Sequence, residues 1–177
     1  TQESKIDQLR DGLPFKLTSG QEKAIDEILS NLRKDNPMSR LLQGDVGCGK
    51  TVVAIVAALF VAENDLQVAF MAPTEILAEQ HYRSWSGILS DFGISTDLLT
   101  SSLRAPAKKK VVDRCAKGET KILFGTHALI YDYVTFDYLG LVIIDEQHRF
   151  GVQQRSKLQA KGENPDLLAM TATPIPR

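Results

Sequence analysis

The stretch that decides the fold reads LLQGDVGCGKT, residues 41–51. From Gly44 to Thr51 it matches the pattern G-x-x-x-x-G-K-[ST], which here follows a strand-like run and precedes the helix-like Val52–Ala62. In such a loop the glycines allow backbone N–H groups to wrap around phosphates, and the N-terminus of the next helix adds positive potential. The stretch therefore predicts a nucleoside triphosphate site on a strand–loop–helix unit.

Each position of this loop has an expected role. We expect Lys50 to neutralise charge on the β- and γ-phosphates and the Thr51 hydroxyl to bind Mg²⁺. A chance glycine-rich turn is the alternative, and the strand before the loop and the helix after it argue against that. The positions expected to contact the nucleotide are Gly44, Asp45, Val46, Gly47, Cys48, Gly49, Lys50 and Thr51.

Short apolar runs like the one before the phosphate-binding loop recur along the chain. They lie at Arg40–Gln43, Gln67–Ala72, Thr96–Thr100, Lys121–Gly125, Leu139–Ile144 and Leu167–Met170. Helix-like stretches separate most of them, and several are continuous rather than alternating, which is typical of strands buried on both faces. Strands that alternate with helices form right-handed βαβ units. We therefore predict an α/β fold, a doubly wound and mainly parallel sheet with helices on both faces.

Length and composition exclude several classes of protein. The chain has 177 residues, of which 43% are hydrophobic and 24% charged, as expected for one soluble domain over residues 1–177, with 1–14 as a linker. No apolar run approaches the roughly 18 residues of a membrane span, and no secretion leader is visible, so we expect a cytoplasmic protein. The net charge of −1 does not by itself indicate a nucleic-acid partner. Cys48 and Cys115 lack partners at disulfide or zinc spacing and are interpreted as free thiols.

Two acids follow the most apolar strand-like run. A phosphate-binding loop needs a carboxylate for the Mg²⁺ shell and, in many hydrolases, a second one that activates water. We expect Asp145 to be the metal partner and Glu146 the general base, since adjacent side chains at a strand end diverge. The alternative is a pair of solvated acids that end a strand.

With these acids the chain resembles a known family. Asp145-Glu146-Gln147-His148 resembles the D-E-x-H box of superfamily 2 helicases. Other stretches resemble further motifs of that superfamily: Phe15, Leu17, Thr18 and Gln21 the adenine motif, Pro73–Ala78 motif Ia, Gly125–His127 motif Ib, and Thr171–Thr173 motif III. More narrowly, the stretches 44–47, 72–81, 145–152 and 171–177 look like the RecG family of bacterial branched-DNA translocases.

This resemblance carries expectations beyond those that the residues alone supply. It implies the first RecA-like P-loop NTPase lobe of an ATP- and Mg²⁺-dependent DNA helicase, acting as a monomer on branched or forked DNA in the bacterial cytoplasm. A second RecA-like lobe with an arginine finger and an N-terminal wedge domain would complete the polypeptide. The implied site residues are Phe15, Leu17 and Gln21 for adenine, Thr74, Thr126 and His127 for DNA, and His148, Thr171 and Thr173 for coupling.

Several residues keep a second interpretation. Gln21 also fits a capping box with Thr18, and Thr74 and Thr126 also fit helix N-caps. The basic stretch from Lys108 to Lys117 is favoured as a solvated helix face over a DNA contact. Rival functions are a transcription–repair coupling translocase, a D-E-x-H RNA helicase, and a P-loop switch or kinase, which would not need motifs Ia, Ib and III.

Overall fold

The structure is a computed structural model that describes residues 2–13, 16–44 and 49–172. Its strands are β1 (Ser39–Gly44), β2 (Gln67–Met71), β3 (Thr96–Leu99), β4 (Ile122–Gly125), β5 (Leu139–Ile144) and β6 (Asp166–Ala172). Its α-helices are α1 (Gln2–Gly12), α2 (Ser19–Leu32), α3 (Lys50–Glu63), α4 (Glu75–Asp91), α5 (Ala105–Ala116) and α6 (Val152–Gln159). Two short 3₁₀ helices are η1 (His127–Ile130) and η2 (Gln147–Arg149).

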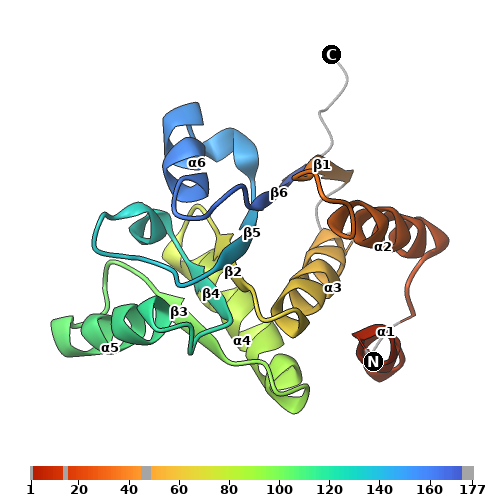
Figure 1. Cartoon of the computed structure of the whole chain (residues 1–177), viewed down its shortest axis with the longest axis horizontal. Coiled ribbons are helices and arrows are strands. Elements are labelled where there is room, and N and C mark those ends of the chain that lie inside the picture. The colour runs from red at the N-terminus through yellow and green to blue at the C-terminus, as the bar shows by residue number, and fades with distance from the viewer. Residues whose placement is uncertain (1, 14–15, 45–48, 173–177) are drawn as a thin grey trace.

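The strands form one sheet in the order β1-β6-β5-β2-β4-β3, and every neighbouring pair is parallel (Figure 1). All of the apolar runs predicted as strands are strands in the structure. Along the register Gly44 pairs with Ala172, and Met71 pairs with both Gly125 and Ile144. The carboxyl ends of these strands therefore meet at one edge of the sheet, which is where α/β sheets bind ligands.

Helices cover both faces of the sheet, as predicted for a doubly wound fold. Val68 and Phe70 of β2 pack in a cluster with α1, α2, α3 and α4, whereas Ala69 and Met71 pack in a second cluster with α5, α6 and η1. In Figure 1, α1, α2 and α3 lie in the right half of the view, and α5 and α6 lie in the left half. Because successive strand side chains point to opposite faces, β2 is buried along its whole length.

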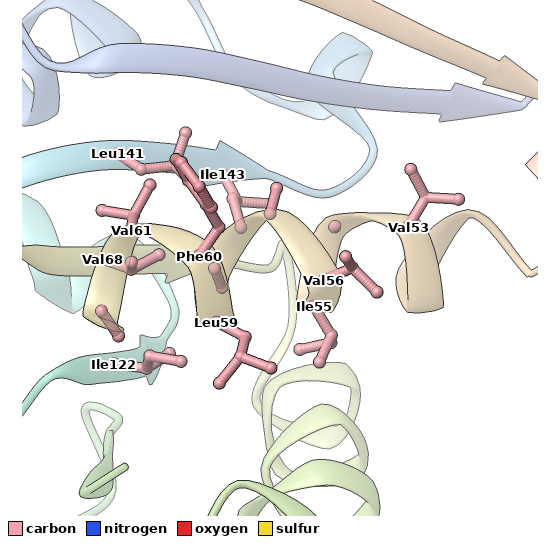
Figure 2. Packing of buried hydrophobic residues seen from close by; sticks show 14 of the residues in the cluster. Val53, Ile55, Val56, Leu59, Phe60, Val61, Val68, Ile122, Leu141 and Ile143 are labelled. Atoms are coloured by element: carbon pink, nitrogen blue, oxygen red, sulfur yellow. The ribbon is translucent and has the colours of Figure 1, made fainter. Parts of the chain in front are cut away.

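Helix α3 is buried on all sides rather than on one stripe. Every residue from Val52 to Ala62 is buried, and Figure 2 shows its side chains packed near Val68, Ile122, Leu141 and Ile143 of the sheet. A helix that is apolar all round belongs in a core. The packing of α3 anchors its N-terminus, where the phosphate-binding loop ends.

Among the described residues no helix is both long and apolar enough to cross a membrane.

The N-terminal segment differs from the predicted linker over residues 1–14. Gln2–Gly12 form α1, which packs against α3 and buries Ile6 and Leu9 in the first core cluster, with Leu13 beside them. These apolar residues recur at helical spacing, so the helix has a narrow apolar stripe that the core accepts. Within the described residues, this segment is part of the domain core rather than a spacer beside it.

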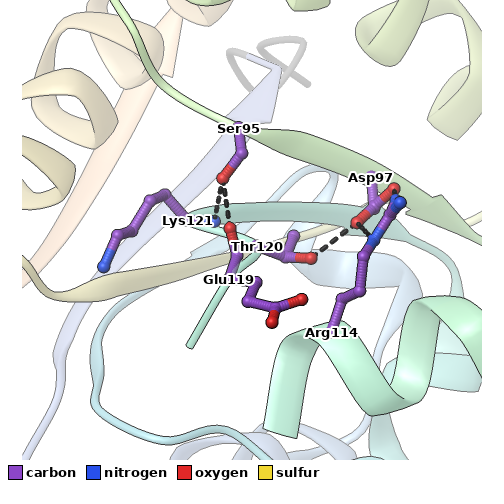
Figure 3. Close-up of polar contacts among 6 residues, drawn as sticks. All are labelled: Ser95, Asp97, Arg114, Glu119, Thr120 and Lys121. Atoms are coloured by element: carbon purple, nitrogen blue, oxygen red, sulfur yellow. Dashed lines mark hydrogen bonds and ion pairs between the residues drawn. The ribbon is translucent and has the colours of Figure 1, made fainter. Parts of the chain in front are cut away.

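A polar network holds the edge strand β3 to α5 and β4 (Figure 3). Arg114 donates two hydrogen bonds to the nearly buried Asp97, which also accepts from the Thr120 hydroxyl at 2.5 Å. Ser95 Oγ donates to the Glu119 carbonyl and accepts from the Lys121 amide. Arg114, part of the basic stretch on α5, therefore joins elements of the fold, and the solvated-face interpretation of the whole stretch stays a prediction.

Candidate nucleotide and metal site

The sheet gathers the predicted motifs at its carboxyl edge. Asp145 directly follows β5, and its amide donates to the Met71 carbonyl at the end of β2 at 2.8 Å. The Ala72 amide, which continues β2, donates to the Gly125 carbonyl at the end of β4, also at 2.8 Å. Motifs Ia and Ib and the acidic pair therefore leave the sheet side by side. The phosphate-binding loop leaves β1 at the same edge.

The end of the phosphate-binding loop requires a glycine. Gly49 has a φ of +81°, and a Cβ atom built on it would lie 1.9 Å from Nε2 of Gln21. The left-handed backbone therefore disfavours any other residue, and a Cβ atom would also displace the end of the Gln21 side chain. Lys50 and Thr51 begin α3 and are both partly exposed. The predicted contacts Asp45, Val46, Gly47 and Cys48 lie outside the described residues.

Gln21 makes the capping box that the sequence allowed. Its Oε1 accepts from the Thr18 amide at 2.8 Å, and its own amide donates to Thr18 Oγ1 at 3.1 Å. The other side of the carboxamide lies beside Gly49, so the cap also places Gln21 against the phosphate-binding loop. Adenine recognition stays a prediction, as does the role of Leu17, which is partly buried against the core. Phe15 lies outside the described residues.

Asp145 and Glu146 directly follow β5, and Glu146 leaves the extended backbone conformation of the strand. Glu146 has φ 52° and ψ 58°, a left-handed conformation that non-glycine residues adopt at a cost of about 1–2 kcal/mol. Glu146 is thus the residue before η2, outside the extended backbone of β5, and the divergence of the two side chains stays a prediction. The Asp145 side chain is only 15% exposed. No cluster of three or more His, Cys, Asp or Glu occurs among the described residues.

His81 is the site residue that the sequence analysis missed. Its Nε2 lies 2.8 Å from Oδ2 of Asp145, and its ring packs 4.9 Å from the ring of Phe70. It also lines a cavity of about 390 Å³ together with Thr51. The sequence analysis assigned His81 no role of its own, because 64 residues separate it from Asp145 and no local spacing relates the two. Its position in the stretch 72–81 that resembles the RecG family, after a strand that borders β5, is the signal that could have found it.

The residues expected to contact DNA sit at helix N-termini. The Thr74 hydroxyl accepts from the Leu77 amide at 3.2 Å and caps α4, and the buried Thr126 accepts from the Ala128 amide at 3.4 Å and caps η1. His127 is exposed. The capping interpretation is therefore confirmed, and a DNA contact at each of these positions stays a prediction that capping does not exclude.

The coupling residues are described only in part. Thr171 lies in β6 in register with Gln43 of β1, and η2, which contains position 148, contacts β6. The backbones of the acidic box and motif III thus adjoin. Thr173 and the side chain of His148 lie outside the described part of the structure.

Sequence comparison finds related proteins over most of the chain. A family model described as DEAD/DEAH box helicase matches residues 18–177. The ATP-dependent DNA helicase RecG of Aquifex aeolicus is 58% identical over 167 residues, covering 93% of this chain and 21% of that protein. The RecG of Streptococcus pneumoniae is 53% identical over 175 residues, covering 99% of this chain and 26% of that protein.

Solved structures have the same fold. The chain matches a structure titled RecG bound to three-way DNA junction with a TM-score of 0.86 and 47% identity, covering 99% of this chain and 23% of that one. The DUF1998 helicase MrfA matches with a TM-score of 0.70 at 17% identity, a likeness of fold alone. This chain spans about a quarter of the length of the RecG proteins it matches. With the family model matched over nearly its whole length, the chain belongs to the DEAD/DEAH box helicase family.

Proposed function

We propose that the chain is the ATP-binding motor lobe of a DNA helicase or translocase. Its substrate is branched DNA, such as stalled replication forks and Holliday junctions, in DNA repair and recombination. The observation that carries the proposal is the meeting of the acidic box, motif Ia and motif Ib at one sheet edge, next to the start of α3. High identity to RecG proteins over nearly the whole chain supports the substrate class.

The site chemistry follows from the residues in place. Lys50 and the loop amides bind the triphosphate, and the oxygens of Thr51 and Asp145 supply hard ligands for Mg²⁺. The metal, when bound, neutralises charge on the transferred phosphoryl group. Glu146, which follows Asp145 in a left-handed backbone conformation, positions and deprotonates the attacking water. Gln21 recognises the adenine edge.

Transmission to DNA uses the remaining motifs. His148, Thr171 and Thr173 couple the binding and hydrolysis of ATP to the DNA contacts of the lobe. Thr74 and Thr126 present helix N-termini, whose N–H groups favour DNA phosphates, and exposed His127 lies beside them. Because the RecG relatives are about four times as long, we place a second RecA-like lobe and a wedge domain in the same bacterial, cytoplasmic polypeptide, which acts as a monomer.

The rival helicases are less well supported. A transcription–repair coupling translocase or an RNA helicase would use the same nucleotide chemistry. The relatives that match over nearly the whole chain are RecG proteins, and Gln147 in the acidic box also resembles that family. We therefore propose branched DNA as the substrate, in preference to a stalled transcription complex or RNA.

Lys50→Ala tests the nucleotide assignment. Titration calorimetry of a non-hydrolysable ATP analogue with Mg²⁺ should show most of the affinity lost, because the variant lacks a charge-assisted contact in a site otherwise built from neutral amides. Lys109→Ala, on the exposed face of α5, is the matched control and should bind like the parent chain. Unchanged affinity in Lys50→Ala would refute the phosphate-binding assignment.

A further inference from the structure

We propose that His81 is a positioning residue that holds Asp145 in the orientation needed for Mg²⁺. The inference rests on the proposed function, which makes Asp145 the metal partner. Oδ2 of Asp145 lies 2.8 Å from Nε2 of His81. A carboxylate can only accept a hydrogen bond, so the histidine donates through Nε2–H. With Oδ2 held in this way, Oδ1 is the oxygen left for the metal.

Packing holds the His81 ring, which is the donor, and the hydrogen bond holds the Asp145 carboxylate, which is the acceptor. The side chains of His81 and Asp145 are 13% and 15% exposed, so water competes little for their contact. The imidazole ring lies at 45° to the fully buried ring of Phe70 on the central strand β2. A donor whose ring is held by the core restricts the rotation of the carboxylate it contacts.

The position of His81 links the two expected metal ligands. On one side it contacts Asp145, and on the other it borders the cavity that Thr51 also lines. Thr51 belongs to α3 and Asp145 follows β5, so neither element alone sets the distance between their oxygens. His81, on helix α4, lies between these two ligands and helps to fix their relative position. Hydrogen-bond partners of metal ligands typically change metal affinity or activity by about 10–100-fold when removed.

Two substitutions separate positioning from simple packing. His81→Phe keeps a flat ring against Phe70 but cannot donate, whereas His81→Gln places an amide N–H near the position of Nε2. Tyr82→Phe is the matched control, because Tyr82 is the next residue of α4 and its ring faces Phe124 instead. Thermal unfolding without nucleotide shows whether each variant is folded.

The readout is metal affinity rather than turnover. Binding of Mn²⁺ to the complex of the 177-residue chain with a non-hydrolysable ATP analogue is followed by electron paramagnetic resonance, and analogue binding without metal is measured in parallel. We expect His81→Phe to weaken Mn²⁺ binding by about 10–100-fold and leave metal-free analogue binding unchanged. His81→Gln should recover most of the affinity, and Tyr82→Phe should match the parent.

The outcomes distinguish this inference from the proposed function. Parental Mn²⁺ affinity in His81→Phe, with weakened affinity in Asp145→Asn, overturns the role of His81 and leaves the metal assignment intact. Equal losses in His81→Phe and His81→Gln also overturn it, because the donor would then not matter. Parental affinity in Asp145→Asn removes the metal role of Asp145 and this inference with it.

A separate observation, independent of the metal site, is a preformed aromatic cavity beside motif Ib. We infer that it takes an unpaired base of single-stranded DNA, a contact that deepens the proposed function. The cavity measures about 490 Å³ and lies between η1 with its following loop and α6. His127, Tyr131 and Tyr133 line one side of it, and Gln153 and Lys157 the other.

The aromatic side of the cavity is exposed and yet held in place. Ring centroids of His127 and Tyr131 are 5.9 Å apart, and those of Tyr131 and Tyr133 are 5.7 Å apart. Tyr133 is 53% exposed. Lys161 donates to the carbonyls of Tyr131 and Val134 at 2.7 and 2.5 Å, which fastens the loop. Exposed, preordered rings are the stacking platforms that proteins use for unpaired bases.

Charge favours a base over a phosphate as the occupant. The lining carries one lysine, Lys157, and one aspartate, Asp132, so its formal charges balance. The amide of Gln153 offers both a donor and an acceptor, which suits the edge of a base.

Tyr133→Ala and Tyr133→Phe test the cavity. The probe is a single-stranded oligonucleotide that contains 2-aminopurine, titrated into the 177-residue chain at several low salt concentrations. Loss of one stacked base should weaken binding by about 5–100-fold and remove the fluorescence quenching in Tyr133→Ala, whereas Tyr133→Phe should behave as the parent. The slope of log affinity against log salt should not change, because stacking releases no counterions.

Three results would overturn the base pocket. They are parental affinity and quenching in Tyr133→Ala, a shallower salt slope in that variant, which would assign the contact to phosphates, and the absence of any quenching in the parent chain.

Discussion

Gln21→Glu and Gln21→Ala separate the two roles that Gln21 combines. In the structure, Oε1 accepts from the Thr18 amide and Nε2 lies beside Gly49. Glutamate keeps an oxygen for the capping box but has no N–H to offer an adenine ring. Alanine removes both functions. Thr18→Ala is the complementary variant, since it breaks the cap and leaves the carboxamide.

The expected magnitudes differ enough to be resolved. A lost capping hydrogen bond costs about 1 kcal/mol, which for a domain of this size lowers Tm by about 2–4 °C. We expect that loss in Gln21→Ala and Thr18→Ala, whereas Gln21→Glu should stay within about 1 °C of the parent. A bidentate amide–adenine contact is worth about 1–3 kcal/mol, or about 5–150-fold in affinity. That loss is expected in both Gln21 variants and not in Thr18→Ala.

Two measurements decide between the roles. Thermal unfolding without nucleotide reports the cap, and calorimetry with non-hydrolysable ATP and GTP analogues reports base recognition. Retention of the preference for ATP over GTP in Gln21→Glu would refute adenine recognition by Gln21 and leave it a capping residue only. An unchanged Tm in Gln21→Ala would refute the energetic argument for the cap.

Further predictions concern the acids, the buried thiol and the isolated lobe. In the longer polypeptide, Glu146→Gln should bind Mg·ATP but not hydrolyse it, because an amide cannot accept the proton; steady-state turnover at the parental rate would contradict this. Burial raises the pKa of the Cys115 thiol from 9.0 to about 12, so the folded state resists thiolate formation and stability should fall as pH rises from about 9 towards 12. Denaturant unfolding across that range, with Cys115→Ala as the reference, would show no extra loss if the reasoning were wrong. The 177-residue chain alone should bind Mg·ATP yet hydrolyse it near background, without stimulation by forked DNA and with weak, salt-sensitive DNA affinity, since an arginine finger from a second lobe is worth about 10³–10⁵ in rate. Robust fork-stimulated turnover in a steady-state assay would overturn that.

Local pattern was enough to predict the elements of this fold. The run Leu139–Ile144 was predicted as a strand and is β5 with the same bounds, and the predicted Val52–Ala62 lies within α3. Continuous apolar runs and helical spacing are properties of neighbouring residues, so they can be read along the chain. The layered α/β arrangement follows from their alternation, because both faces of such strands must be covered.

The capping box of Thr18 and Gln21 could be predicted from the sequence. That the same Gln21 side chain also lies beside the phosphate-binding loop could not. Thr18 and Gln21 are three residues apart, so their reciprocal hydrogen bonds are local chemistry. The approach of Gln21 to Gly49 depends on how α2 lies beside the start of α3, which no local spacing reveals. The same limit explains why residues 1–14 were interpreted as a linker, since only packing against α3 shows what the apolar stripe of α1 covers.

The sequence alone determined the strands, the buried helix and the chemical types at the sheet edge, because each depends on residues within a few positions of one another. The tertiary structure decided which of those residues meet. His81 reaches Asp145 only because β2 and β5 are neighbours in the sheet, and Arg114 is drawn from a basic run to Asp97 only because α5 packs beside β3. Hydrogen bonds between distant residues form where the packing of the core brings their backbones together, and that packing is a property of the whole chain.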